Sequence, residues 1–390
     1  MDPVTILLLI VGFWAVIYIV SRMIGTERLN EKGIDTGTPL FLMIRTERLN
    51  AFLTRMGKKF PRAFWNVGIV VAFGGMIFGF YIFADNFLKF FITPAEAGGV
   101  VPIIPGVTIS GLPMVYMLIG LAVTLITHEF AHGLASSKDE VPIKSSGILI
   151  FLVIFGAFVE PDDEVFEKEV GPRTRMRLFA AGSYANLITA FVVFLLMMNF
   201  NPMMSIAFNQ PNGAYIYETV SGTPGAEALQ IGDVIVGLND TDINNWTDVG
   251  TFMANTTAGS QVTIHTLDGS PVAVVLAANP NNATLGYIGV LGADHWEPKP
   301  GWDLFLSPLF VLHVQQILLW TWIVLVSVGL LNLLPVPALD GDRILKNALS
   351  LVTDDEKKIK YVMWPLRIAS LVIVLGSIVL SLYLGKGIFG

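Results

Sequence analysis

The chain has 390 residues, of which 53% are hydrophobic and 14% charged, and its mean hydropathy is +0.65. Soluble domains usually carry about 25% charged residues, so a chain this poor in charge must hide much of its surface in lipid. The net charge of −7 argues against a nucleic-acid-binding protein. The sequence has no cysteine, which excludes disulfides, thiolate metal sites and cysteine nucleophiles. Any histidine site must come from five residues: His128, His132, His265, His295 and His313.

Six apolar segments are long enough to cross a bilayer, which takes about 20 apolar residues. In chain order they are Pro3–Ser21, Ala63–Ala84, Pro113–Ser136, Leu178–Phe200, Gln316–Leu334 and Ile368–Gly385. The first has no basic residue before it and no small-residue cleavage site after it, so we interpret it as an anchor and not as a signal peptide. The fifth lies in a longer apolar run, in which we expect Pro308 to separate an interfacial piece from the span.

The charges of the loops predict the orientation, because basic loops tend to stay in the cytoplasm. Nine Lys and Arg residues lie from Arg22 to Arg62, whereas Thr93–Leu112 has none. Residues 201–300 hold nine Asp and Glu residues and a single basic one, Lys299. We therefore predict a multi-pass protein of the cell membrane, with residues 201–300 and both chain ends outside the cytoplasm.

The segment Lys144–Glu160 is apolar but only about 16 residues long, which is short for a span. It is rich in Ile, Val and Phe and contains Gly147 and Gly156. These features favour a β-hairpin that dips into the membrane under cover of the helices. A buried re-entrant helix is the alternative.

Residues 201–300 have the pattern of a separate β-rich domain. A helical stretch, Asn245–Asn255, separates short β-type runs at Ala214–Val220, Asp233–Leu238, Gln261–Thr266, Val272–Ala277 and Leu285–Val290. The block that begins at Gly232-Asp233 resembles a PDZ domain with the bacterial strand order. Such domains add an extended peptide to a sheet edge, and Tyr287–Val290 is a candidate loop for a peptide C-terminus. The alternative is a small sandwich that only closes an entrance.

The predicted third span contains the motif His128-Glu129-Phe130-Ala131-His132. A spacing of four residues places both imidazoles on one face of a helix, where they can supply two of the four ligands of a zinc ion. Glu129 can then act as a base toward a water held by the metal. Burying three ionisable groups in lipid costs a few kcal/mol each, which disfavours a purely structural role.

Asp340 is the candidate for the third zinc ligand. His128 lies ten residues before Lys138, about 15 Å from the cytoplasmic end of its helix. Asp340 follows the inward-going fifth span, and two nearby prolines can break that helix so that the chain dips back. Asn186 lies about 13 Å in from the same side, so polar groups on three spans converge at one depth.

Three segments together resemble the site-2 protease family of intramembrane zinc metalloproteases. They are His128–Gly133, Ala180–Asn186 and Asn332–Gly341, and the predicted hairpin and the inserted PDZ-like domain are also similar to those of the family. The resemblance covers Pro113–Arg343. This sequence departs from the family at Ser183, which is often Pro, and at Asp342, which is often Gly.

The resemblance implies roles for six residues. Zinc is ligated by His128, His132 and Asp340, and Glu129 activates the water. Asn186 and Asn332 would orient the substrate or stabilise the oxyanion. For the two asparagines, hydrogen bonding between helices is the alternative.

The sequence thus predicts an α-helical polytopic membrane protein with about six spans, a membrane-inserted β-hairpin and a PDZ-like domain. We divide it into residues 1–112 (two spans and a basic loop), 113–200 (catalytic core, first part), 201–300 (PDZ-like domain) and 301–390 (catalytic core, second part). The predicted function is hydrolysis of peptide bonds within the transmembrane segments of membrane-anchored proteins, with Zn²⁺ as cofactor. The competing hypothesis is a metal-binding membrane scaffold or transporter gated by the PDZ-like domain. A scaffold needs the ligands but not the base Glu129.

Overall fold

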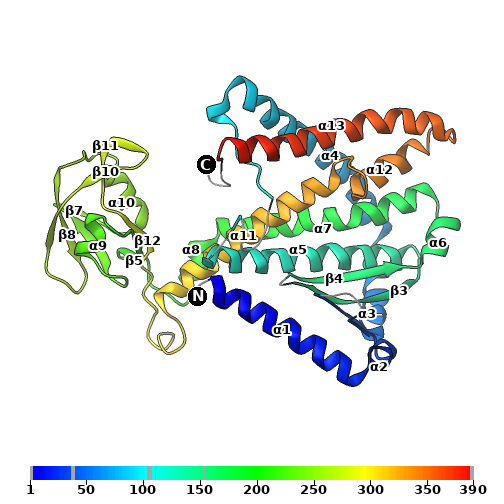
Figure 1. Ribbon diagram of the computed structural model, residues 1–390, viewed down its shortest axis with the longest axis horizontal. Coiled ribbons are helices and arrows are strands. Elements are labelled where there is room, and N and C mark those ends of the chain that lie inside the picture. Colours follow the sequence, from blue (N-terminus) through cyan, green and yellow to red (C-terminus); the bar gives the residue numbers. More distant parts are fainter. Residues whose placement is uncertain (1–2, 37–39, 103–107, 110, 153, 387–390) are drawn as a thin grey trace. The chain divides into compact units, whose positions relative to one another are not determined.

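The structure is a computed structural model that describes residues 3–36, 40–102, 108–109, 111–152 and 154–386 (Figure 1). The chain divides into two compact units. The first consists of Met1–Leu195 and Ile317–Gly390 and is mainly helical, and the second is Leu196–Gln316 and is rich in strands.

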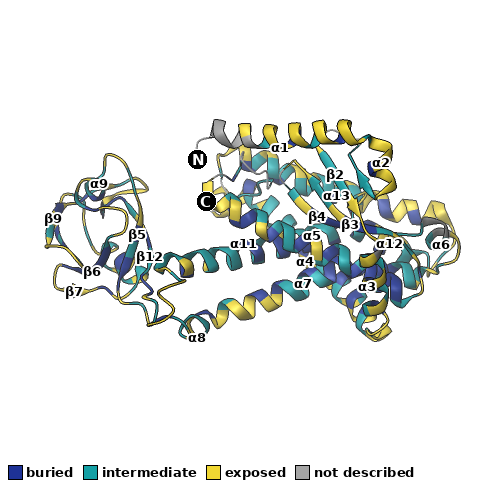
Figure 2. Cartoon of the chain, turned by 90° about the horizontal axis from the view of Figure 1, so that it is seen from below, coloured by how far each residue is buried: buried dark blue, intermediate teal, exposed yellow. Residues whose placement is uncertain are grey.

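Five helices of the described chain are long and apolar enough to cross a membrane. They are α4 (Arg62–Ile92), α5 (Gly111–Lys138), α7 (Pro172–Met198), α11 (Pro308–Leu333) and α13 (Glu356–Tyr383). The sixth predicted span is helix α1 (Pro3–Ile24), of which Ile10–Ile24 is a shorter apolar stretch. Many large apolar residues on these helices are exposed, for example Val70 and Ile77 at 72% each, and Figure 2 shows that much of α1 is exposed. Helices that are apolar all round are typical of membrane spans.

Prolines set the ends of α11. Pro308 is its first residue, a position where the missing N–H costs nothing, and the helix ends at Leu333 before Pro335 and Pro337. Pro308 therefore marks the boundary expected of it, but the helix begins at this proline and not near Gln316. Helix α13 also begins earlier than the predicted span, since Asp355 caps it by accepting hydrogen bonds from the amides of Lys357 and Lys358.

The predicted hairpin is present as β3 (Ile143–Phe151) and β4 (Ile154–Pro161). Two strands of the first loop extend it, β1 (Ile34–Asp35) and β2 (Phe41–Arg45), in the antiparallel order β1-β2-β3-β4. Strand β4 packs against α5, where a Cβ on Gly156 would stand 3.2 Å from Leu125. Small residues thus bring the hairpin close to the helix that carries the two histidines.

One edge of β4 has no strand partner within the described chain. The carbonyl of Ser146 on β3 accepts a hydrogen bond from Thr46 N at 2.9 Å, on the β2 side of β3. Ser146 is paired in register with Val159 of β4. Because backbone groups alternate along a strand, Val159 directs its N–H away from β3, toward the free edge.

Two ion-pair clusters join the helices of the first unit. Asp139, at the end of α5, accepts from Arg177 of α7 at 2.7 and 3.0 Å and from Arg62 of α4 at 3.0 Å. Asp342 of α12 (Asp340–Leu349) accepts two hydrogen bonds from Arg367 of α13, at 2.6 and 2.7 Å. Bidentate pairs of this kind fix the relative position of two elements as well as contributing energy.

The second unit contains a sheet with the strand order β12-β5-β6-β8-β9. Its strands and helix α10 enclose a core that includes Ile216, Ile235, Leu238 and Ile264, all 0% exposed. The element bounds are β5 (Ala214–Thr219), β6 (Val234–Leu238), β7 (Thr241–Asp242), α10 (Trp246–Met253), β8 (Gln261–Thr266), β9 (Val272–Val275), β10 (Ala277–Asn279), β11 (Asn282–Tyr287) and β12 (Val290–Asp294). The predicted single run Leu285–Val290 was wrong, because Gly289, at φ +83°, separates two strands there.

The remaining elements are short. They are α2 (Thr26–Glu31), α3 (Glu47–Gly57), the 3₁₀ helix η1 (Pro94–Glu96), α6 (Asp163–Lys168), α8 (Phe200–Met204) and α9 (Pro224–Ala228).

Candidate metal centre

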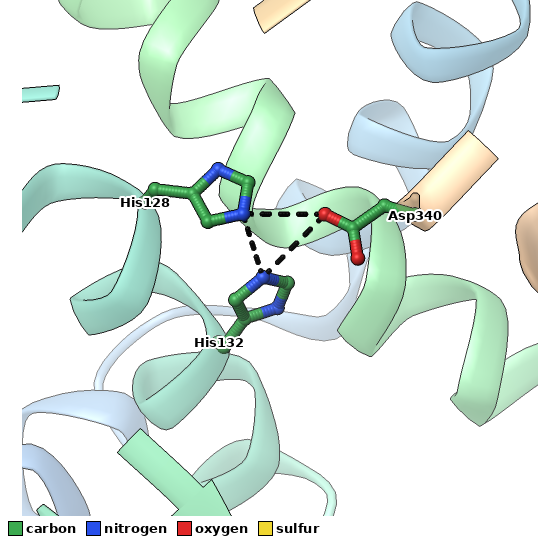
Figure 3. A group of neighbouring side chains, drawn as sticks. All are labelled: His128, His132 and Asp340. Carbon is green, nitrogen blue, oxygen red and sulfur yellow. Dashed lines mark hydrogen bonds and ion pairs between the residues drawn. The ribbon is translucent and has the colours of Figure 1, made fainter. Parts of the chain in front are cut away.

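Three side chains from two elements point at one another in the first unit (Figure 3). His128 and His132 lie one turn apart on α5, and Asp340 is the first residue of α12. Asp340 Oδ2 lies 3.2 Å from His128 Nε2 and 3.6 Å from His132 Nε2, and the two Nε2 atoms are 3.1 Å apart. The carboxylate and imidazole atoms that bind metals thus converge on one point.

These distances fit a tetrahedral zinc ion. Ligand atoms about 2.0–2.1 Å from zinc, at the tetrahedral angle, stand about 3.3–3.4 Å from each other. The three observed separations of 3.1, 3.2 and 3.6 Å lie close to that edge length. Asp340 Oδ2 is buried and, among the described residues, has no hydrogen-bond partner of good geometry, as expected of an atom that is placed to bind a cation.

The local sequence explains how Asp340 reaches this position. After α11 ends, the chain turns through Pro335 and Pro337, and Ala338 adopts φ +77°. Gly341 then lies so close to the carbonyls of Leu333 and Leu334 that a Cβ would overlap them. The carboxylate stands in the first turn of α12, where the helix dipole favours a negative charge.

A cavity of about 280 Å³ opens beside the three residues. Glu129 lines it together with the two histidines and Asp340. The Glu129 carboxylate accepts a hydrogen bond from Val159 N, at 3.3 Å, through the free edge of β4. The predicted base, the predicted ligands and a strand edge therefore meet at one cavity.

The structure places the two asparagines differently. Asn186 of α7 is 0% exposed, and its amide lies 3.3 Å from His128 Nδ1 and 2.8 Å from Thr127 Oγ1. Asn332 is half-buried near the end of α11. Among the residues that the structure describes, no hydrogen bond joins its side chain to the three converging residues, and neither asparagine is part of the cavity wall.

Two further features of the site were not anticipated. His132 Nδ1 lies 2.7 Å from the carbonyl of Leu178 on α7, which can only accept, so the ring donates from this atom and directs the lone pair of Nε2 to the cavity. Arg343 lines the cavity and stacks over Phe179, at 5.2 Å from the ring centroid. It follows Asp340 by three residues, which puts both on one helix face, and this spacing was the available signal.

The sequence matches the model of "Peptidase family M50" over residues 116–375, about two thirds of the chain. The chain belongs to this family, the site-2 protease family. It is therefore a membrane metallopeptidase of M50 type, and the residues that converge in Figure 3 all lie inside the matched region.

Two relatives illustrate the breadth of the similarity. An uncharacterized protein of Methanocaldococcus jannaschii is 26% identical over 351 residues, 86% of this chain and 83% of its own length. A membrane-bound transcription factor site-2 protease homolog of Arabidopsis thaliana is 25% identical over 142 residues. That match covers 35% of this chain and 26% of the plant protein.

Among solved structures, PDZ domains of SdrC-like proteins from Listeria monocytogenes and Listeria innocua are similar to this chain. They show 20% and 23% identity, each with a TM-score of 0.19. The match covers 21% and 20% of this chain and 87% and 92% of the two domains. The predicted fold class of a helical membrane protein with a β-rich part is confirmed by the five long apolar helices and the second unit's sheet in the described chain.

Proposed function

We propose that this M50 peptidase is a zinc metalloendopeptidase that hydrolyses peptide bonds within the transmembrane segments of membrane-anchored proteins. The observation that carries the proposal is the triangle of His128, His132 and Asp340. The distances between its three ligand atoms match the distances between the corners of a tetrahedral zinc site, and the cavity lies beside these atoms. A catalytic zinc site keeps one position open, whereas a structural site closes all four with protein ligands.

The residues around the triangle have the chemistry that peptide hydrolysis requires. A zinc ion held by His128, His132 and Asp340 would polarise the scissile carbonyl and make a water acidic at neutral pH. The Glu129 carboxylate, which lines the same cavity, would take the proton of the attacking water and deliver it to the leaving amine. The Arg343 side chain, also on the cavity wall, would offer positive charge toward the oxyanion.

A transmembrane substrate must unwind before it can be cut, because a helix shields its carbonyl carbons. The backbone groups of the substrate that lose their helical hydrogen bonds then need other hydrogen-bond partners, because the bilayer core contains no water. The free edge of β4 supplies them by strand addition, and the Val159 N–H that now binds Glu129 marks the end of this edge at the cavity. We therefore assign β4 to substrate binding.

Charge and composition support the remaining assignments. The basic loops favour a cytoplasmic active-site side, and the acidic β-rich domain favours an extracytoplasmic position in the cell membrane. The lipid bilayer and single-span proteins are the expected partners, together with a peptide C-terminus at the β-rich domain. The proposed functional division remains at residues 112, 200 and 300.

Metal analysis and one base variant test the proposal. The purified chain should hold one zinc ion, and His128→Ala, His132→Ala or Asp340→Ala should each lower the zinc content. Glu129→Gln keeps the shape of the side chain but removes the base. This variant should retain zinc and lose peptidase activity by about 10²- to 10⁴-fold.

Two results would contradict the proposal. Full zinc content in Asp340→Ala would remove this residue from the ligand set. Undiminished cleavage by Glu129→Gln would show that Glu129 is not the base. Arg55→Gln serves as the control for expression and solubilisation, since Arg55 lies outside the cavity wall.

A further inference from the structure

The residues of α5 and α7 that pack around the His128 ring form a distinct feature of the site. Three residues take part: Thr127, next to His128 on α5, and Gly182 and Asn186 on α7. Gly182 and Asn186 are four residues apart and therefore share one face of α7. We call these three residues the His128 cradle.

Gly182 provides the space that the imidazole occupies. A Cβ built at this position would stand 2.5 Å from Cε1 and 2.6 Å from both nitrogens of the His128 ring. Any side chain there would push the ring out of place, toward or away from Asp340. Glycine is thus required by the close approach of an imidazole to the α7 backbone.

Asn186 and Thr127 lie on the Nδ1 side of the His128 ring. In the structure the Thr127 hydroxyl lies 2.8 Å from Asn186 Oδ1 and 2.9 Å from Val123 O, and Asn186 Nδ2 lies 3.3 Å from His128 Nδ1. A half-turn of the amide exchanges its oxygen and nitrogen, so that the oxygen accepts the hydrogen of His128 Nδ1 while Thr127 accepts from the nitrogen and donates to Val123 O. This arrangement leaves the lone pair on Nε2, directed at Asp340 and the point where the three ligand atoms converge.

Burial separates this role from direct contact with substrate. Asn186 is 0% exposed and absent from the cavity wall, whereas an oxyanion donor must reach the reacting carbonyl. The contacts of its amide go to Thr127 and His128. Asn186 therefore acts through His128.

We propose that the His128 cradle positions His128 as a metal ligand: Gly182 by leaving room, and Asn186 and Thr127 by holding the hydrogen on Nδ1. The inference rests on the proposed function, because it assumes that the triangle binds zinc. His132 has a backbone carbonyl for the same purpose, that of Leu178. The partner of His128 Nδ1 is a side chain, unlike that of His132, so a substitution can remove it.

Zinc affinity of the purified full-length protein, measured by competition with a chromogenic chelator, tests this. Asn186→Leu should weaken zinc binding by about 10- to 100-fold, the usual effect of losing a partner of a ligating histidine. Thr127→Val should change affinity in the same direction, and Gly182→Ala should do so by displacing the ring. Asn186→Asp keeps an acceptor for Nδ1 and should restore most of the affinity lost in Asn186→Leu.

The matched control is Thr124→Val on the same helix. Thr124 is 0% exposed like Asn186, and its hydroxyl bonds Gly120 O at 2.8 Å, so its substitution should leave zinc affinity unchanged. Thermal unfolding of the zinc-free proteins reports folding separately. If Asn186→Leu does not fold, Thr127→Val carries the test, because valine has nearly the shape of threonine.

The outcomes separate this inference from the proposed function. A wild-type chain without zinc would overturn the proposed function. A wild-type chain that binds zinc, with equal affinity in Asn186→Leu and Thr127→Val, would overturn the cradle alone. A fall in kcat of Asn186→Leu at full zinc occupancy, with unchanged affinity, would assign Asn186 to the reacting peptide and also overturn the cradle.

Discussion

At the scale of single residues, the two histidines of α5 have different kinds of partner at Nδ1. The Nδ1 of His132 faces a main-chain carbonyl, whereas the Nδ1 of His128 faces an asparagine side chain. Both partners come from α7 and lie two helical turns apart, at Leu178 and Asn186. Helix α7 thus supports both imidazoles without contributing a ligand of its own.

A third histidine, His295 in the β-rich domain, couples stability to pH. This residue is 8% exposed, its ring stacks on Tyr215, and its Nδ1 lies 2.6 Å from Asn212 Oδ1. Burial lowers the pKa of the imidazole below its ordinary value, against the opposing attraction of Glu297 and Asp268.

The unfolded chain therefore binds a proton at a pH where the folded domain does not. The contribution of His295 to stability is complete above about pH 6.5 and falls as the pH drops below that value. The protection factors of the domain amides in the full-length protein, which compare each exchange rate with that of an unfolded peptide at the same pH, should fall between pH 6.5 and 5, and less so in His295→Gln. His265→Gln is the control, and an equal fall in His295→Gln would show that another group is responsible.

At the scale of elements, β4 is proposed to bind the substrate beside the residues that would hydrolyse it. Its N–H groups alternate between β3 and the free edge, and the hydrogen bond from Val159 to Glu129 fixes which set faces outward. By that alternation the N–H groups of Phe155, Ala157 and Val159 face the edge, whereas those of Gly156 and Phe158 face β3.

The effect of proline substitution along β4 should therefore alternate from one residue to the next. Ala157→Pro removes one outward donor, and the loss of one hydrogen bond to an extended substrate should lower kcat/KM by about 3- to 10-fold while zinc content stays normal. Cleavage of a purified single-span substrate and metal analysis are the two measurements.

Phe158→Pro provides the matched comparison, since it removes a donor to β3 and should lower thermal stability. Equal tolerance of proline at both positions would argue against strand addition. Substrates with Gly or Pro in their span should be the least affected, because they unwind most easily.

The sequence predicts those parts of the fold that depend on local pattern. Hydrophobic length located the spans, the i, i+4 spacing paired His128 with His132, and β-branched composition identified the hairpin. Strand β2 was not predicted, because all five of its residues pair with a distant strand, β3, and only two of them pair with the nearby β1. The partners of Asn186 could not be predicted either, since burial and hydrogen-bond partners depend on how α5 packs against α7 and not on either helix alone.

At the scale of the whole molecule, the β-rich unit interrupts the unit that contains the metal centre. It is inserted between Leu195 and Ile317, so the chain leaves the helical unit at the end of α7 and returns through α11. The triangle thus combines residues from both sides of the insertion. Whether these residues meet at one depth in the membrane depends on the proposed orientation of the spans.

Cysteine labelling tests that orientation, and the cysteine-free sequence makes the experiment unambiguous. Asn239, Asn255 and Lys357 are all exposed. In intact cells, an impermeant maleimide should label Asn239→Cys and Asn255→Cys but should label Lys357→Cys only after lysis. Labelling of Lys357→Cys from outside would invert the orientation, and the unsubstituted chain is the blank.

Because of the same insertion, the ribosome synthesises the residues of the site at different times. A ribosome that adds about 5–20 residues per second completes the helix of His128 and His132 roughly 10–40 s before it reaches Asp340, about 200 residues later. The whole β-rich unit has to be made in that interval and, in the proposed orientation, exported. On the proposed roles, a nascent chain carries two ligands and a base but no third ligand, and it would remain inert toward neighbouring membrane proteins until biogenesis is nearly complete.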